Sequence, residues 1–206
     1  KSVNFAQNNS TSITIKYPMK RIVLFASGSG SNVENISQYF LQNKEISIVT
    51  VFTNKSDAKV IERCNRLNIS ALYFNKTAFY ETDCVLDILK SCNPDLIILA
   101  GFLWKIPEKL IKTFPNKIVN IHPALLPKYG GKGMYGMHVH NAIKANNEQE
   151  TGITIHFVNE NYDEGAIIKQ VKTKISPEDT PTDIANKVHQ LEYEYFPKVI
   201  DDLLHG

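Results

Sequence analysis

The chain has 206 residues, of which 43% are hydrophobic and 21% charged, and this size and composition indicate a single globular domain. Its 23 Lys and Arg residues nearly balance 21 Asp and Glu residues, so a formal charge of +2 excludes the strongly basic surface of a nonspecific nucleic-acid binder. No apolar run reaches the roughly 18 to 20 residues needed to cross a bilayer, and the three cysteines form no CxxC pair. We therefore expect a soluble cytoplasmic protein without nucleic-acid or membrane partners.

The first 18 residues are rich in Asn, Ser and Thr, with no acidic residue and no apolar segment of a secretory signal. We interpret residues 1–18 as a flexible N-terminal extension, and the sequence leaves open whether it is native, targeting or added. The folded domain is expected to span residues 19–206.

From residue 21 onward, apolar runs alternate with helical patterns. Strands are predicted at residues 21–26, 46–52, 71–74, 96–100 and 118–122. Helices are predicted between them at residues 32–42, 56–67, 77–92 and 107–114. This alternation predicts an α/β fold of the Rossmann-like kind, an open, mostly parallel, twisted sheet with helices on both faces.

The second half of the chain is more irregular. Residues 123–137 contain two prolines and four glycines and are predicted to form a long loop of functional importance. Residues 152–158 alternate between apolar and polar side chains, which indicates a half-exposed strand, and residues 166–175 form a further strand. A final helix is predicted at residues 182–204, which Pro197 must kink or break.

In such sheets, ligands bind at the carboxyl ends of the strands. The SGSGSN segment, residues 27–32, follows the first strand and offers backbone N–H groups and a helix N-terminus to a phosphate. Val33 replaces the third glycine of a dinucleotide fingerprint, and Lys132 lacks the context of a Walker A loop. The alternative is a tight turn with a capping box between Ser31 and Glu34, and the segment alone leaves both interpretations open.

Asn120 and His122 alternate along a predicted strand, so their side chains lie on the same side. An amide donor and an imidazole together can polarise a carbonyl and move a proton. Asp163, in the turn between the last two strands, is the candidate carboxylate, and near His122 it would raise the imidazole pKa. Each residue alone is more often structural, and spacing does not show that they meet.

Other chemistries have less support. His138 and His140 are two residues apart in a predicted helix, without a metal motif, so no metal site is expected. Gly28-Ser29-Gly30 lacks the glycine spacing of the nucleophile elbow in a Ser-His-Asp hydrolase. Trp104 either stacks a planar ligand or packs as a buried or interface aromatic.

Four segments together resemble one family: SGSGSN, the AGF of residues 100–102, the NIHPALLP of residues 120–127, and HFV with a trailing D-x-G at residues 156–165. They resemble the phosphoribosylglycinamide formyltransferases, folate-dependent enzymes of purine biosynthesis, from about residue 19 to the C-terminus. The resemblance implies a formyltransferase fold with a phosphate-binding first half and a folate-binding second half. It also implies transfer of the formyl group of 10-formyltetrahydrofolate to the amine of glycinamide ribonucleotide, without a metal, by a monomer or weak homodimer.

The resemblance also implies roles for individual residues. Asn120 and protonated His122 would stabilise the oxyanion of a tetrahedral intermediate, and Asp163 would keep His122 charged and relay the amine proton. The ribonucleotide would be bound by Ser29, Gly30, Ser31, Asn32 and Glu192. The folate would be bound by Leu103, Trp104, Lys105, Ile106, Asn120, Asn159, Glu160, Asn161, Tyr162 and Asp163.

Two features depart from the family pattern. Trp104 stands where many relatives have Arg, and the loop at residues 128–140 is longer than the family's form, so we expect it to close differently over the site. The rival functions are a 10-formyltetrahydrofolate hydrolase, an enzyme similar to methionyl-tRNA formyltransferase, and a noncatalytic nucleotide-binding module. The first two resemble this domain with an additional one, for which we expect the chain to lack room.

Overall fold

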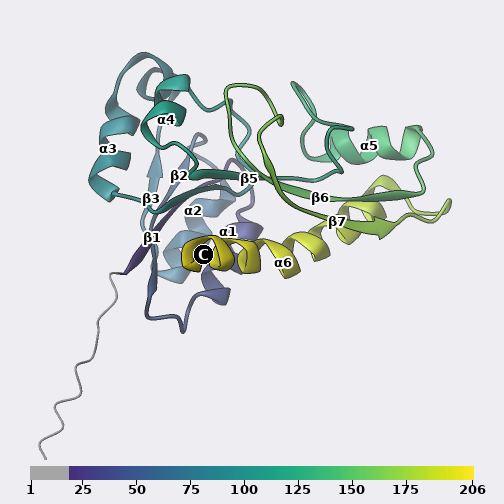
Figure 1. Ribbon diagram of the computed structural model, residues 1–206, viewed down its shortest axis with the longest axis horizontal. Coiled ribbons are helices and arrows are strands. Elements are labelled where there is room, and N and C mark those ends of the chain that lie inside the picture. Colours follow the sequence, from purple (N-terminus) through teal and green to yellow (C-terminus); the bar gives the residue numbers. More distant parts are fainter. Residues whose placement is uncertain (1–18) are drawn as a thin grey trace, which may run out of the picture.

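The computed structural model describes residues 19–206 (Figure 1), so the extension predicted at residues 1–18 lies outside the described part. One seven-stranded sheet has the order β3-β2-β1-β4-β5-β6-β7. The strands are β1 (Lys20–Phe25), β2 (Ile46–Thr53), β3 (Ala71–Tyr73), β4 (Leu96–Leu99), β5 (Ile118–His122), β6 (Glu150–Phe157) and β7 (Ile167–Lys174). The first five pair in parallel and the last two antiparallel, which confirms the open, mostly parallel α/β sheet.

Helices cover both faces of the sheet, as the alternating residues of β1 show. Ile22 and Leu24 belong to one buried cluster with α1, α2 and α6, whereas Val23 and Phe25 belong to another with α3 and α4 (Figure 1). The helices are α1 (Ser31–Tyr39), α2 (Lys59–Leu67), α3 (Cys84–Cys92), α4 (Glu108–Thr113), α5 (Met137–Ala145) and α6 (Pro181–His205). Within residues 19–206, no helix combines the length and hydrophobicity needed to span a membrane.

The predicted helix at residues 77–92 is interrupted. A π-helical turn, η1 (Thr77–Glu81), comes first, and α3 begins only at Cys84. Thr82 is extended, with φ −117° and ψ 175°, and its hydroxyl accepts a hydrogen bond from the Cys84 N–H. Thr and Asp side chains compete for backbone groups in this way, which ends helices.

Of the two outcomes predicted for Pro197, a kink or a break, the break does not occur, because α6 is continuous from Pro181 to His205 with Pro197 inside it. Proline removes the N–H that would bond to the carbonyl four residues earlier, here that of Tyr193. The Asn35 side-chain amide of α1 donates to this carbonyl at 3.0 Å. A tertiary contact thus replaces the missing helical hydrogen bond, and α6 continues across the sheet.

The prediction of a half-exposed strand at residues 152–158 is also wrong. Thr154 and His156, on the polar face of β6, are 0% and 2% exposed. The loop after β5 covers this face, and the Thr154 hydroxyl donates to the Ala124 carbonyl at 2.7 Å. Because Thr154 and His156 are buried and have hydrogen-bond partners, the alternating polar residues of β6 do not face solvent. They face a polar part of the interior next to the candidate site.

Candidate active site

The loops that follow β1, β4 and β5 surround one cavity of about 640 Å³. The turn at residues 158–163, the loop at residues 131–136 and one face of α6 complete its walls. Every residue proposed from the sequence as catalytic or ligand-binding lines this cavity except Glu160, which is exposed. Parallel strand ends thus bring together segments far apart in the chain.

The loop at residues 27–32, which we call the phosphate loop, turns from β1 into α1. Gly30 has φ +73°, and a Cβ added there would lie 2.4 Å from Val60 Cγ2, so only glycine fits without strain. The capping box between Ser31 and Glu34, one of the two interpretations left open by the sequence, does not form, because α1 has no side-chain cap. Glu34 instead pairs with Arg63 and Arg66 of α2.

Four side chains meet at the end of β5, and we call them the reactive cluster. Asp163 Oδ2 lies 3.6 Å from His122 Nδ1, and Asp163 Oδ1 lies 3.7 Å from His156 Nε2. Asn120 and His156 face each other across β5 and β6, and the Asn120 amide lies 3.1 Å from His156 Nε2. The structure therefore brings together all three residues predicted to be catalytic and adds His156.

Two backbone carbonyls show which nitrogen of the His122 and His156 rings carries a proton, because a carbonyl oxygen can only accept a hydrogen bond. His122 Nε2 lies 2.7 Å from the Tyr129 carbonyl, so Nε2 carries a proton and Nδ1 is left facing Asp163. His156 Nδ1 lies 2.8 Å from the Phe157 carbonyl, so Nδ1 carries a proton, and Nε2 faces both the Asn120 amide and Asp163.

Burial dominates the electrostatics of His122. Burial lowers the pKa of His122 below its usual value, although the Asp163 carboxylate and the Tyr129 carbonyl oppose this effect. For Asp163, burial would raise the pKa, but His156, His122 and the Gly131 N–H outweigh it and lower the pKa. The free protein therefore favours an ionised Asp163 beside a neutral His122, whereas the sequence predicted a raised pKa for His122.

Next to the phosphate loop, a second polar pair is buried. Asn32 donates to Glu192 Oε2 of α6 at 2.8 Å, and Glu192 is 6% exposed. Burial raises the pKa of Glu192. Within the described residues, the buried Asn32 Oδ1 has no hydrogen-bond partner, although Asn32 lines the cavity. A bound ligand with a donor group would satisfy this oxygen.

The sequence analysis assigned no individual role to several residues that line the cavity, although it expected the loop that contains residues 131–136 to close over the site. These residues are Lys55, Gly131, Lys132, Gly133, Met134, Tyr135, Gly136, His140, His156 and His189. Burial, followed by the neighbouring His189 and His122, lowers the pKa of His140 to about 4. The HFV motif contained His156, but only strand register reveals that it meets Asn120. Among residues 19–206, no group of three or more His, Cys, Asp or Glu side chains is arranged to hold a metal.

Trp104 packs as an aromatic of the cavity wall, which is one of the two roles predicted for it, and stacking on a planar ligand stays a prediction. It lines the cavity and also packs against an aromatic cluster, with its ring centroid 6.0 Å from those of Phe74 and Phe79 and 5.9 Å from that of Tyr80. Lys76 Nζ lies 5.9 Å from the Trp104 ring centroid. The indole is therefore fixed in position at the cavity wall.

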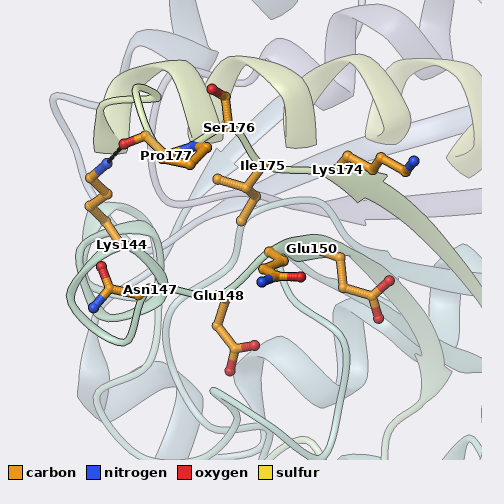
Figure 2. A pocket seen from close by; sticks show the side chains of 9 residues that line it. Lys144, Asn147, Glu148, Glu150, Lys174, Ile175, Ser176 and Pro177 are labelled. Carbon is orange, nitrogen blue, oxygen red and sulfur yellow. Dashed lines mark hydrogen bonds between the residues drawn. The ribbon is translucent and has the colours of Figure 1, made fainter.

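A second cavity of about 660 Å³ lies where α5 ends and β6 begins, next to the end of β7 (Figure 2). Lys144 lies at one edge of this cavity and donates to the Pro177 carbonyl at 2.6 Å, and Glu148 accepts from the Tyr129 hydroxyl at 2.8 Å. None of the predicted site residues lines this cavity. Volume alone does not distinguish the two cavities, whereas convergent buried polar groups do.

Residues 20–200 match the model of the formyl transferase family. The chain is 37% identical over 187 residues to a chloroplastic phosphoribosylglycinamide formyltransferase of Arabidopsis thaliana, a match that covers 88% of this chain and 64% of the relative. It is 36% identical over 193 residues to the phosphoribosylglycinamide formyltransferase of Bacillus subtilis, covering 90% of this chain and 95% of the relative. The chain thus spans less than two thirds of the plant relative but nearly all of the bacterial one.

Solved structures show the same likeness. Glycinamide ribonucleotide transformylase 1 from Geobacillus kaustophilus superposes with a TM-score of 0.81 at 34% identity, covering 90% of this chain and 99% of that chain. The similarity therefore extends over nine tenths of this chain.

Proposed function

The chain belongs to the formyl transferase family, and from this premise we propose that it transfers the formyl group of 10-formyltetrahydrofolate to the primary amine of glycinamide ribonucleotide. One observation carries the proposal: Asn120, His122 and Asp163 converge in the same cavity as the phosphate loop. The bacterial relative of matching length bears the name of this activity, which supports the choice of acceptor.

The reaction needs one bond exchange and one proton transfer. The amine nitrogen of the ribonucleotide bonds to the formyl carbon, and the bond from that carbon to the folate nitrogen breaks. The amine loses a proton and the folate nitrogen gains one. Between these events the formyl oxygen carries negative charge, and hydrogen-bond donors aimed at it lower the barrier. Asn120 is the donor that we assign to this oxygen from the start, and His122 becomes a second donor once its Nδ1 has taken up the amine proton.

His122 is proposed to begin the reaction neutral. Its lowered pKa favours the neutral ring, whose Nδ1 is available because Nε2 is bonded to the Tyr129 carbonyl. As negative charge develops on the formyl oxygen, the imidazolium becomes more favourable, so Nδ1 takes up the amine proton and later passes it to the folate nitrogen. The ionised Asp163 stabilises the imidazolium between these two steps.

Binding is divided between two parts of the cavity. In the proposal, the phosphate loop holds the ribonucleotide phosphate through Ser29, Gly30, Ser31 and Asn32, with Glu192 beside its amine or ribose end. The folate lies along the segments at residues 103–106 and 159–163. Glu160 is left out of the proposed contacts, because it does not line the cavity.

An acceptor panel tests this function. The purified chain is mixed with 10-formyltetrahydrofolate and, in separate reactions, glycinamide ribonucleotide, methionyl-tRNA or buffer, and formylated product is measured by mass spectrometry. The proposal predicts rapid formylation of the ribonucleotide alone. Loss of the formyl group from the folate at the same rate in buffer as with the ribonucleotide would indicate a 10-formyltetrahydrofolate hydrolase. Formylation of the tRNA would indicate an enzyme similar to methionyl-tRNA formyltransferase. No turnover with any acceptor, despite ribonucleotide binding, would indicate a noncatalytic module.

A further inference from the structure

Two consecutive carbonyl groups of the phosphate loop point toward α2. The Gly28 carbonyl accepts from the Val60 N–H at 3.1 Å, and the Ser29 carbonyl accepts from Arg63 Nε at 2.6 Å. In a planar trans peptide the N–H points opposite to the carbonyl, so the N–H groups of Ser29 and Gly30 point away from α2. Both residues line the cavity. These two groups are therefore oriented as donors to an anionic ligand.

Arg63 connects this loop to both neighbouring helices. It lies on α2, contacts the Ser29 carbonyl through Nε, and pairs through its terminal nitrogen with Glu34 in the first turn of α1. Arg66 holds the other oxygen of Glu34 at 2.5 Å. The Arg63 and Glu34 side chains are 28% and 21% exposed, and neither residue lines the cavity. The pair of Arg63 and Glu34 therefore contacts the side of the phosphate loop that faces away from the cavity, and it does not touch a ligand in the cavity.

We propose that Arg63 and Glu34 are positioning residues that orient the peptide groups of the phosphate loop and thereby set the affinity for the substrate phosphate. This inference rests on the proposed function, because it takes the loop to be the phosphate site. Arg63 and Arg66 share Glu34, so this group keeps one positive charge, and the positioning role of Arg63 is distinguished from long-range attraction of the phosphate by comparison with a variant that lacks Arg66. The planar guanidinium contacts both partners at once, which a lysine cannot reproduce.

The alternative is that Gly30 alone fixes the loop through its contact with Val60. In that case the pair of Arg63 with Glu34 would be an ordinary surface ion pair, which contributes little to stability or binding. The two accounts predict different kinetics for a variant that lacks the guanidinium.

The test compares Arg63→Met with Arg66→Met in the full chain. Arg66 also pairs with Glu34, so the control removes a similar charge from the same helix. For Arg63→Met we expect the KM for glycinamide ribonucleotide to rise about tenfold, the effect of losing one charge-assisted hydrogen bond. The KM for formyl folate and kcat should stay within about twofold, and Arg66→Met should match the parent. Arg63→Lys should give an intermediate KM.

Three outcomes would overturn the inference. The KM for the ribonucleotide could be unchanged in Arg63→Met, or it could rise equally in Arg66→Met. In the third, Arg63→Met would lower kcat and raise the KM values for both substrates by similar factors. Calorimetric binding of ribose 5-phosphate separates this result from the proposed function. If the parent binds this ester but transfers no formyl group, the proposed function is wrong. Tenfold weaker binding by Arg63→Met would still support the positioning role, and equal binding would overturn it. A parent that does not bind the ester would overturn the positioning role, because the loop would then not be a phosphate site, whereas the proposed function is decided by formyl transfer.

Discussion

The phosphate loop and the reactive cluster lie in one cavity but are built differently. The loop after β1 is a short continuous segment that presents backbone groups, and its shape depends on Gly30 and on contacts with α2. The reactive cluster gathers four side chains from β5, β6 and the turn before β7, with β4 between β5 and β1 in the sheet. Changes in the loop should therefore alter binding, whereas changes in the cluster should alter the rate of reaction.

The largest expected effect is at His122. His122→Ala removes the proposed proton acceptor and donor, so kcat should fall by a factor on the order of 100 or more. The dissociation constant for glycinamide ribonucleotide, measured by calorimetry, should stay within about twofold of the parent. His138→Ala is the matched control, because His138 is an exposed histidine outside the cavity. Unchanged turnover in His122→Ala would remove this residue from the chemistry.

Asp163→Asn should give the next largest effect and a shift in pH dependence. The Asp163 carboxylate raises the pKa of His122 against the effect of burial, so the neutral amide should lower that pKa further. Because His122 must be neutral to accept a proton, the rate rises with pH through this pKa. The rising limb should therefore move to lower pH, and the plateau should fall about tenfold because the imidazole is a weaker base. A pH-rate profile superimposable on the parent's would contradict the assignment.

In the phosphate loop, Gly30→Ala should weaken binding more than it slows the reaction. Its φ of +73° and the 2.4 Å approach to Val60 force the loop to shift, at an expected cost of about 1 to 3 kcal/mol in unfolding free energy. The KM for the ribonucleotide should rise about fivefold with kcat near that of the parent. In Gly28→Ala the added Cβ meets nothing within 4 Å, so the rise should be smaller. If Gly30→Ala and Gly28→Ala raised the KM for the ribonucleotide equally, the backbone strain expected at Gly30 would not be what weakens binding.

Glu192→Gln should have the smallest effect, seen in stability. Burial raises the pKa of Glu192 in the folded state, so its stabilising contribution is complete below the unfolded pKa and is lost as pH rises through the folded one. Glutamine cannot ionise and keeps an oxygen for the Asn32 amide. Thermal denaturation should therefore show a higher Tm for Glu192→Gln than for the parent at pH 8, and little difference near pH 4. If the difference in Tm between Glu192→Gln and the parent were the same at pH 8 and pH 4, ionisation of the buried Glu192 would not be its cause.

Local patterns in the sequence predicted much of the fold and part of the site. The order of strands and helices follows from apolar periodicity, and the shared side of Asn120 and His122 follows from the period of two in β5. The phosphate loop could be predicted because glycines between a strand and a helix carry their own conformational signal. In each case the relevant information lies within a few residues.

The remaining features depend on contacts between distant segments. His156 joins the cluster through the pairing of β6 with β5, and spacing along the chain does not determine that register. Glu34 pairs with Arg63 instead of capping α1, and Asn35 compensates for Pro197, because neighbouring helices supply the partners. The lowered pKa of His122 likewise follows from burial, which only the folded protein reveals.

The division of labour between loop and cluster is tested most directly by single-turnover rates with both substrates saturating, in the parent, Gly30→Ala and His122→Ala. Saturation removes differences in binding, so only the chemical step is compared. We predict that Gly30→Ala reacts within about threefold of the parent, whereas His122→Ala is slower by about 100-fold or more. A His122→Ala rate equal to the parent's would contradict the account.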